Sequence, residues 1–270
     1  MPGKAGAPTA GSARPQLVAT DLDGTLLRSD GTASARTGAV LRAVQAQGVQ
    51  TVLVTARPPR WLHDLTHLVG DGGVALCGNG AFVYDVHSRR LLAEHGIEPA
   101  VVDEIVADLR KAFPSMAFGA ERRSGFGREE TFGTASDEPV GKLLGRLPDI
   151  RDDAFVEEVS RIVGERGVVA YSGAGGLAEI SAPGVTKAVA LADWCTRLEV
   201  AADDVWAFGD MPNDLPMLAW AGKAFAVANA HPDVLDAADH VVPSNDDDGV
   251  AATLEGILDP SSTGGVGETP

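Results

Sequence analysis

The stretch QLVATDLDGT at residues 16–25 decides the expected fold. Its first half is a short apolar run, typical of a buried strand, and two carboxylates, Asp21 and Asp23, follow it directly. Apolar residues at helical spacing come next over Gly31–Gln47, and a β-branched run follows over Val49–Thr55. Because strands that alternate with helices form βαβ units, this order predicts an α/β fold with a parallel sheet.

The strand–helix alternation is interrupted in the middle of the chain by a block that favours helices and antiparallel hairpins. We therefore predict a Rossmann-like parallel-sheet core from residues 16–82 and 184–258, with residues 83–183 inserted as an α+β cap. Residues 1–15 and 259–270 are rich in small residues, Gly and Pro, and are expected to be a disordered leader and tail.

The sequence also predicts the local structure of three segments. Pro58–Val69 begins with proline and ends before glycine, which predicts one continuous helix. Phe82–Tyr84 and Leu91–Leu92 are expected to pair as a hairpin within the insert. Met116–Gly145 is rich in glycine and charge, and it is expected to be irregular.

Charge and cysteine usage exclude several classes of partner. The chain has 22 Lys and Arg against 38 Asp and Glu, a formal net charge of −16. Binding to nucleic acid or to an anionic membrane is therefore not expected, because both need excess positive charge. Cys77 and Cys195 form no CxxC pair, and the chain lacks the run of about 18 apolar residues that would cross a membrane. These features predict a cytoplasmic protein without a signal peptide.

Polar motifs follow three of the predicted strands. Asp21 and Asp23 follow the first strand, Thr55 ends the second, and GDMPND at residues 209–214 follows the strand Val205–Phe208. Ligands of open α/β sheets bind beyond the carboxyl ends of the strands, so these motifs are expected to meet at one site. Neighbouring carboxylates repel unless a cation is bound, and oxygen ligands with little His or Cys favour Mg²⁺.

Such a site suits phosphoryl transfer. One carboxylate can attack phosphorus and form an acyl-phosphate, while a second can protonate the leaving group and later deprotonate water. A hydroxyl such as that of Thr55, an ammonium group and Mg²⁺ would neutralise the phosphoryl oxygens in the transition state. A small phosphorylated partner is compatible with the negative net charge, since a bound cation reverses the local field.

Four short motifs occur in this order along the chain: DLDGTL at residues 21–26, Thr55, Lys187 and GDMPND at residues 209–214. Together they resemble the haloacid dehalogenase (HAD) superfamily. Gly78–Ala81 and Leu177–Lys187 are in addition similar to its Cof-type branch, subfamily IIB, whose members carry a large α+β cap of the C2 type. The resemblance implies a HAD-like hydrolase fold over Leu17–Leu258.

The resemblance also implies a role for each matching residue. Asp21 matches the nucleophile and Asp23 the general acid and base. Thr55 matches the hydroxyl that binds the phosphate, and Lys187 the lysine that holds nucleophile and phosphate. The residues expected to contact the substrate are Gly24, Thr55, Ala56, Lys187 and Asn213. Ala56 stands where this branch often has glycine, and alanine fits there if its backbone does not need a positive φ.

The same resemblance implies Mg²⁺ as the cofactor. Its expected protein ligands are the Asp21 carboxylate, the Asp23 backbone carbonyl and Asp210, with Asp214 orienting the surroundings of the metal. The expected activity is a Mg²⁺-dependent phosphatase that hydrolyses a sugar phosphate or cofactor phosphate through an aspartyl-phosphate intermediate. A phosphosugar mutase and a non-catalytic metabolite-binding or regulatory module are the alternatives, and monomer and homodimer both stay open.

Overall fold

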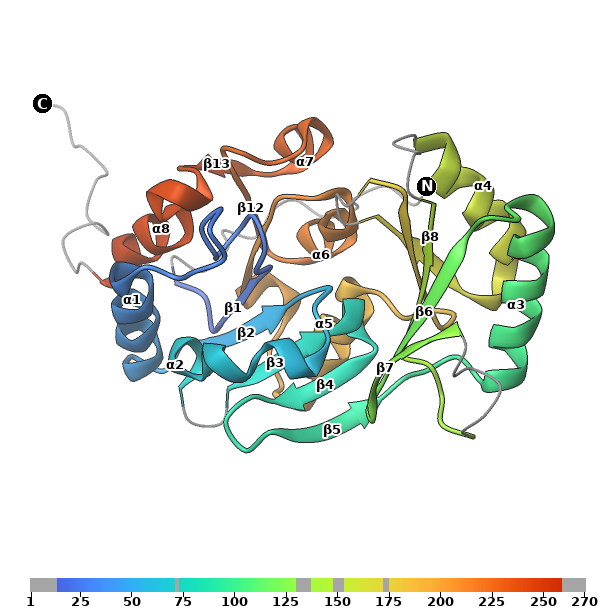
Figure 1. Cartoon of the computed structure of the whole chain (residues 1–270). Coiled ribbons are helices and arrows are strands. Elements are labelled where there is room, and N and C mark those ends of the chain that lie inside the picture. The colour runs from blue at the N-terminus through green and yellow to red at the C-terminus, as the bar shows by residue number, and fades with distance from the viewer. Residues whose placement is uncertain (1–13, 71–72, 130–136, 148–152, 172–174, 259–270) are drawn as a thin grey trace, which may run out of the picture.

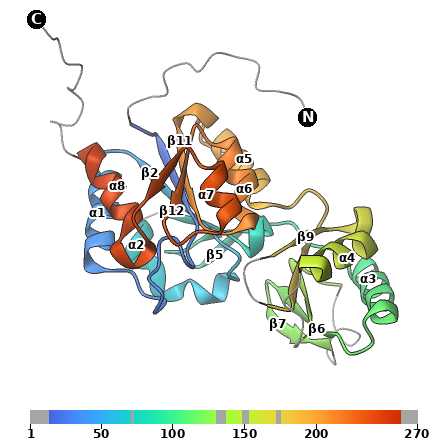
Figure 2. The ribbon, with the colours of Figure 1, turned by 90° about the horizontal axis from the view of Figure 1, so that it is seen from above.

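The computed structural model describes residues 14–70, 73–129, 137–147, 153–171 and 175–258. These residues form two β-sheets, one of eight strands with helices on both faces and one of five strands (Figures 1 and 2). The predicted tail, and the predicted leader apart from residues 14 and 15, lie outside the described residues. No helix in the described part of the chain is long and apolar enough to cross a membrane.

Strands and helices alternate along the described chain. The strands of the large sheet are β1 (Leu17–Thr20), β2 (Gln50–Val54), β3 (Val74–Cys77), β4 (Phe82–Asp85), β5 (Arg90–Glu94), β11 (Val205–Gly209), β12 (Lys223–Val227) and β13 (His240–Val242). Those of the small sheet are β6 (Ala117–Arg122), β7 (Gly125–Arg128), β8 (Lys142–Arg146), β9 (Val168–Ala170) and β10 (Leu177–Ser181). The α-helices are α1 (Ala35–Ala46), α2 (Thr66–Val69), α3 (Pro99–Ala112), α4 (Asp153–Val163), α5 (Lys187–Arg197), α6 (Leu215–Trp220), α7 (Pro232–Ala237) and α8 (Gly249–Leu258).

The large sheet places β1 between β11 and β2. Its strand order is β13-β12-β11-β1-β2-β3-β4-β5, parallel from β13 to β3 and antiparallel for the last two strands. Thr20, at the end of β1, lies level with Leu53 on β2 and Phe208 on β11. The segments that follow these three strands therefore emerge side by side at one edge of the sheet.

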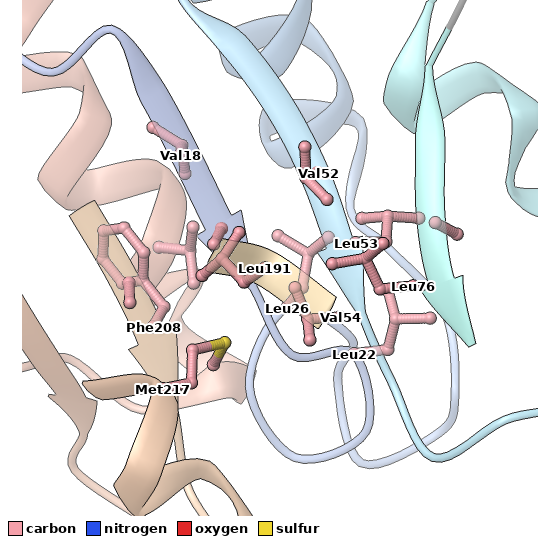
Figure 3. Close-up of a cluster of buried hydrophobic side chains, with 14 of the residues drawn as sticks. Val18, Leu22, Leu26, Val52, Leu53, Val54, Leu76, Leu191, Phe208 and Met217 are labelled. Carbon is pink, nitrogen blue, oxygen red and sulfur yellow. The ribbon is translucent and has the colours of Figure 1, made fainter. Parts of the chain in front are cut away.

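Burial explains why these central strands form. Every residue of β1 and β11 is buried, and both strands read as apolar runs, as expected for a parallel sheet covered on both faces. α1 packs against α2 and α8 on one face, and α6 packs against α5 and α7 on the other (Figure 2). Figure 3 shows Val18, Leu53 and Leu76 from neighbouring strands in one buried cluster with Leu191 and Met217 from the helices.

The β4–β5 hairpin extends the large sheet, which differs from its expected place in the insert. β4 pairs antiparallel with β3, with Phe82 opposite Cys77, and β5 forms the edge of the sheet. A lone two-stranded hairpin is marginally stable, and here it gains a third strand as partner. The chain leaves the large sheet only after Glu94, so the boundary predicted between residues 82 and 83 falls inside β4.

The expected continuous helix over Pro58–Val69 is wrong. The segment forms short 3₁₀ turns at Pro59–Trp61 and His63–Leu65, and only its last four residues are α-helical. Leu62 and Leu65 both have φ of −100° with ψ close to zero, at the border of the helical region. The segment is therefore divided into two 3₁₀ turns and one short α-helix.

The expectation of irregular structure over Met116–Gly145 is also wrong, because β6, β7 and all but the last residue of β8 lie there. Glycine often interrupts regular structure, but Gly141 has a packing role. A Cβ at Gly141 would lie 2.1 Å from the ring of Phe82, so only glycine lets the chain just before β8 approach the large sheet this closely. Residues 130–136 of the segment lie outside the described residues.

The small sheet has one face against helices and one face toward the core. Its order is β7-β6-β8-β10-β9, and Phe118 packs with α3 and α4 in a second hydrophobic cluster. Alternate residues of a strand point to opposite faces. Lys142 and Leu144 on β8, and Glu179 opposite Leu144 on β10, therefore share the face that is turned toward the core.

Candidate active site

A cavity of about 330 Å³ lies where the ends of the central strands meet the free face of the small sheet. Six of the nine predicted site residues line it: Asp21, Asp23, Thr55, Ala56, Lys187 and Asn213. Asp210 and Asp214 are buried and do not line it, and Gly24 lies against Asp210. The structure thus gathers the predicted residues at one place, as expected from their positions after parallel strands.

Lys187 joins two carboxylates in the interior of the site. It begins α5, whose first turn is capped by the Thr186 side chain. Its Nζ donates to Asp21 Oδ1 and to Asp214 Oδ1, each at 2.6 Å, and the side chain is only 2% exposed. Burial lowers the pKa of Lys187, but the two carboxylates outweigh burial and hold the pKa above its ordinary value. Lys187 is therefore a charged group fixed between two anions.

Asp21 experiences opposing influences. Its burial raises the pKa of the carboxyl well above the ordinary value, while the Lys187 ammonium pulls it down. The carboxylates of Asp210 and Asp214 raise the pKa further because their charges repel that of Asp21. Additional positive charge near Asp21 would therefore favour its ionised form, which is the form that can act as a nucleophile.

Asp214 organises the loop after β11. Its Oδ2 accepts hydrogen bonds from the backbone N–H groups of Asp210 and Met211, each at 3.1 Å. Its Oδ1 accepts from Lys187, so both oxygens have protein partners. Asp214 is fully buried, and its contacts fix the position of Asp210 relative to Lys187.

Asp210 keeps one oxygen open. Its Oδ1 accepts a hydrogen bond from the Thr25 hydroxyl at 2.7 Å. Gly24 has a φ of +81°, and a Cβ there would lie 2.3 Å from Asp210 Oδ2, so the missing side chain leaves room for that oxygen. Burial raises the pKa of Asp210 to about 6, the Thr25 hydrogen bond opposes this rise, and the charge of Asp214 adds to it.

The buried carboxylates fit a divalent cation. Asp21, Asp210 and Asp214 each bring one oxygen within 4.8 Å of the others. Asp21 Oδ2 and Asp210 Oδ2 have no hydrogen-bond partner among the described residues, whereas both oxygens of Asp214 are engaged. Hard oxygen donors that repel one another are the donor set that Mg²⁺ or a similar ion stabilises.

Asp23 lies on the exposed side of the cavity and has a partner that the sequence analysis did not assign. Arg57 donates two hydrogen bonds to its carboxylate, that from Nε at 2.7 Å, and the Asp23 side chain is 58% exposed. Arg57 stands two residues after Thr55, which was the available signal. A local sequence pattern does not predict which carboxylate an arginine will pair with in the folded chain.

The turn after β2 carries Thr55 and Ala56. The buried Thr55 hydroxyl oxygen accepts a hydrogen bond from the Arg57 N–H at 3.1 Å, which leaves its own O–H free to donate. Ala56 does not adopt a positive φ, so alanine fits where glycine was the usual residue. The Ala56 carbonyl accepts from Lys142 of the small sheet at 2.6 Å.

Asn213 connects the loop after β11 to residues that sequence reasoning missed. Its Nδ2 donates to Asn79 Oδ1 at 3.3 Å, and its own Oδ1 is buried without a hydrogen-bond partner in the described part of the chain. A buried acceptor without a partner is uncommon and is often explained by a water molecule or ligand that completes its hydrogen bonds. Asn79 and Glu179 lie in the two segments that resemble the Cof-type branch, which was the available signal. Neither they nor Lys142 were predicted as site residues, because the three become neighbours only when the small sheet covers the core.

Asp210→Asn is expected to raise the thermal stability of the metal-free protein at pH 7. The pKa of Asp210 is about 6 against an ordinary value of 3.8, so ionisation at pH 7 costs the folded state roughly 3 kcal/mol, which an amide avoids. The folded chain binds the proton of the Asp210 carboxyl more tightly than the unfolded chain does. The wild type therefore regains that stability as the pH falls from 6 to 4. Thermal unfolding in EDTA at pH 7 and pH 4 measures the difference, and equal melting temperatures at pH 7 would contradict the assignment.

Known proteins match this chain along nearly all of its length. Residues 18–129 and 127–254 match the family described as haloacid dehalogenase-like hydrolase. A phosphoglycolate phosphatase from Methanopyrus kandleri is 30% identical, over 90% of this chain and 97% of that protein. A 5-amino-6-(5-phospho-D-ribitylamino)uracil phosphatase, YcsE from Bacillus subtilis, is 28% identical, over 88% of this chain and 94% of that protein.

A solved structure has the same fold. A haloacid dehalogenase-like hydrolase from Bacteroides thetaiotaomicron superposes with a TM-score of 0.77 at 25% identity. The superposition covers 90% of this chain and 100% of that one, so it includes both sheets. The predicted α/β fold with a Rossmann-like core and a cap is therefore confirmed.

Proposed function

The chain belongs to the haloacid dehalogenase-like hydrolase family and is a phosphatase, and on that premise we propose that it hydrolyses a small phosphorylated metabolite with Mg²⁺ as cofactor. One observation carries the proposal. Asp21 lies in the wall of the cavity, bonded to a charged Lys187 and beside carboxylates that fit a divalent cation.

The proposed first half-reaction transfers the phosphoryl group to Asp21. A carboxylate oxygen of Asp21 attacks phosphorus, the bond from phosphorus to the ester oxygen breaks, and Asp23 gives that oxygen a proton. The free O–H of Thr55 and the ammonium of Lys187 stabilise the charge on the phosphoryl oxygens. Arg57 holds the Asp23 carboxyl at the cavity, and this pairing must open for Asp23 to give the proton.

The second half-reaction releases phosphate. Asp23, now ionised, takes a proton from a water molecule, and the water oxygen attacks the phosphorus of the aspartyl-phosphate. The bond between phosphorus and the Asp21 oxygen breaks, so inorganic phosphate leaves and the carboxylate is restored. Asp21 and Asp210 would hold the Mg²⁺, together with the Asp23 carbonyl that the family resemblance implies, and the ion would supply positive charge that stabilises the phosphoryl oxygens.

The cavity supports a small substrate. Its volume of about 330 Å³ lies at the low end for small-molecule sites. The cations on its walls are paired with carboxylates, as Arg57 is with Asp23 and Lys142 with Glu179, and such pairs can exchange hydrogen bonds with hydroxyl groups. We therefore propose a sugar phosphate or a cofactor phosphate as substrate, and the expected cytoplasmic location stays a prediction.

Phosphate release from a panel of phosphorylated metabolites tests the function. With Mg²⁺ present, the purified protein is expected to release inorganic phosphate from several sugar and cofactor phosphates. EDTA is expected to lower the rate at least about a hundredfold, because the metal supplies several kcal/mol of charge stabilisation, and added Mg²⁺ should restore it. Absence of release from every compound would refute the proposal, while isomerised sugar phosphate without free phosphate would favour a mutase.

A further inference from the structure

A buried hydrogen-bond chain connects the small sheet to the core beside the cavity. Glu179 on β10 accepts from the Asn79 amide at 2.9 Å with Oε2, and from the Lys142 ammonium at 2.9 Å with Oε1. Glu179 and Lys142 belong to the small sheet, whereas Asn79 belongs to the turn between β3 and β4. Glu179 and Lys142 are 4% exposed and Asn79 is 3% exposed, so little water can replace a lost partner.

Asn79 stands where three parts of the active site meet. Its N–H donates to the Thr55 carbonyl at 3.0 Å, its Nδ2 donates to Glu179, and its Oδ1 accepts from Asn213. Its backbone is left-handed, with a φ of 60°, between two glycines that also have positive φ. Asn tolerates this conformation better than most residues. A buried non-glycine residue held in this way is typical of a functional site.

Lys142 forms a second branch from Glu179 to the turn after β2. Its Nζ donates to the Ala56 carbonyl at 2.6 Å, one residue after Thr55. The turn that carries Thr55 is therefore held from two directions, by the Asn79 N–H at the Thr55 carbonyl and by Lys142 at the Ala56 carbonyl. Glu179 contacts both residues, because it accepts from the Asn79 side chain and neutralises the Lys142 charge.

We propose that Asn79 and Glu179 are positioning residues of the phosphatase. The hydrogen bond between them links the packing of the cap on the core to the positions of Thr55 and Asn213. Neither residue takes part in the chemistry itself. The expected change in kcat rests on the proposed function. The contact between cap and core can be tested without measuring turnover.

The sharpest test exchanges donor and acceptor. Asn79→Asp places a second carboxylate against Glu179, and Glu179→Gln removes the anion that holds Lys142. Each single variant is expected to lower kcat at least tenfold, with a smaller change in KM. The combined variant, Asn79→Asp with Glu179→Gln, restores a donor opposite an acceptor and keeps the net charge, so kcat is expected to recover to within about threefold of wild type. Glu158→Gln, a matched change in an exposed ion pair on α4, should leave kcat unchanged.

Hydrogen exchange measured by mass spectrometry gives a readout that does not need turnover. The single variants are expected to exchange faster than wild type over residues 55–58 and 78–81, and the combined variant should return to wild-type protection. Circular dichroism confirms that each variant is folded. Single variants with wild-type kcat and protection, or a combined variant no better than the worse single one, would overturn the inference. If wild type releases no phosphate at all, the proposed function fails. The hydrogen-exchange data alone then show whether Asn79 and Glu179 hold the cap on the core.

Discussion

Asp21→Asn is expected to abolish phosphate release while the protein stays folded. An amide cannot form the acyl-phosphate, so the rate should fall by at least about a thousandfold, as for other variants that lose a catalytic nucleophile. The Asn carbonyl can still accept the hydrogen bond from Lys187. Because burial already raises the pKa of Asp21, replacing it by a neutral group should not lower the melting temperature. The same phosphate assay with Mg²⁺, together with thermal unfolding, measures both results.

The control for Asp21→Asn is the same substitution at an exposed position. Asp108→Asn on α3 changes a carboxylate that contacts only surface cations, and it should retain full activity. A purified Asp21→Asn protein that keeps near-normal turnover would remove Asp21 as the nucleophile. Intact-protein mass spectrometry adds a direct test, since a phosphorylated species should form transiently in wild type and not in the variant.

Lys187→Met is expected to destabilise the protein and to remove its activity. The substitution leaves Asp21 and Asp214 buried without the ammonium that lies 2.6 Å from each. Removing one partner of a buried ion pair costs about 3–5 kcal/mol, because the remaining charge is uncompensated. For a chain of this length that corresponds to a fall in Tm of roughly 10 °C. Thermal unfolding should be recorded in EDTA at pH 7, so that no metal replaces the lost charge.

A second substitution separates stability from catalysis at Lys187. Adding Asp214→Asn to Lys187→Met removes one of the two uncompensated carboxylates, and it should recover a large part of the lost Tm. Activity should remain absent, because the cation beside Asp21 is still missing. If Lys187→Met has the same Tm as wild type, the ion pairs of Lys187 contribute nothing to stability, and the prediction from their burial is wrong.

Position after a strand was enough to predict which acidic and hydroxyl side chains gather, whereas Lys187 was predicted only from the family resemblance. Asp21, Thr55 and Asp210 follow β1, β2 and β11, and apolar runs marked each of these strands. The family resemblance implied that Asp214 orients the surroundings of the metal, and in the structure its carboxylate reaches back to the N–H groups of its own loop. These are properties of contiguous residues, and parallel pairing then brings the strand ends together.

Other features could not be anticipated from composition. Glycine and charge over Met116–Gly145 favour irregular structure, yet Gly141 is where the chain, just before β8, approaches Phe82. Phe82 lies far away in the sequence, so the local pattern contains no signal for this contact. The residues of the β4–β5 hairpin, in turn, do not indicate whether it pairs with β3 or within the insert.

The sequence by itself determined the α/β core and the set of residues that meet at its edge, because strand burial and turn chemistry are local and parallel topology orders the ends. Only the tertiary structure decided the pairs across the site. Asn79 and Glu179 are 100 positions apart, and Arg57 meets Asp23 across two strand ends. Those contacts depend on how one folded sheet packs over another, and that orientation is the sum of many side-chain contacts rather than a property of any one segment.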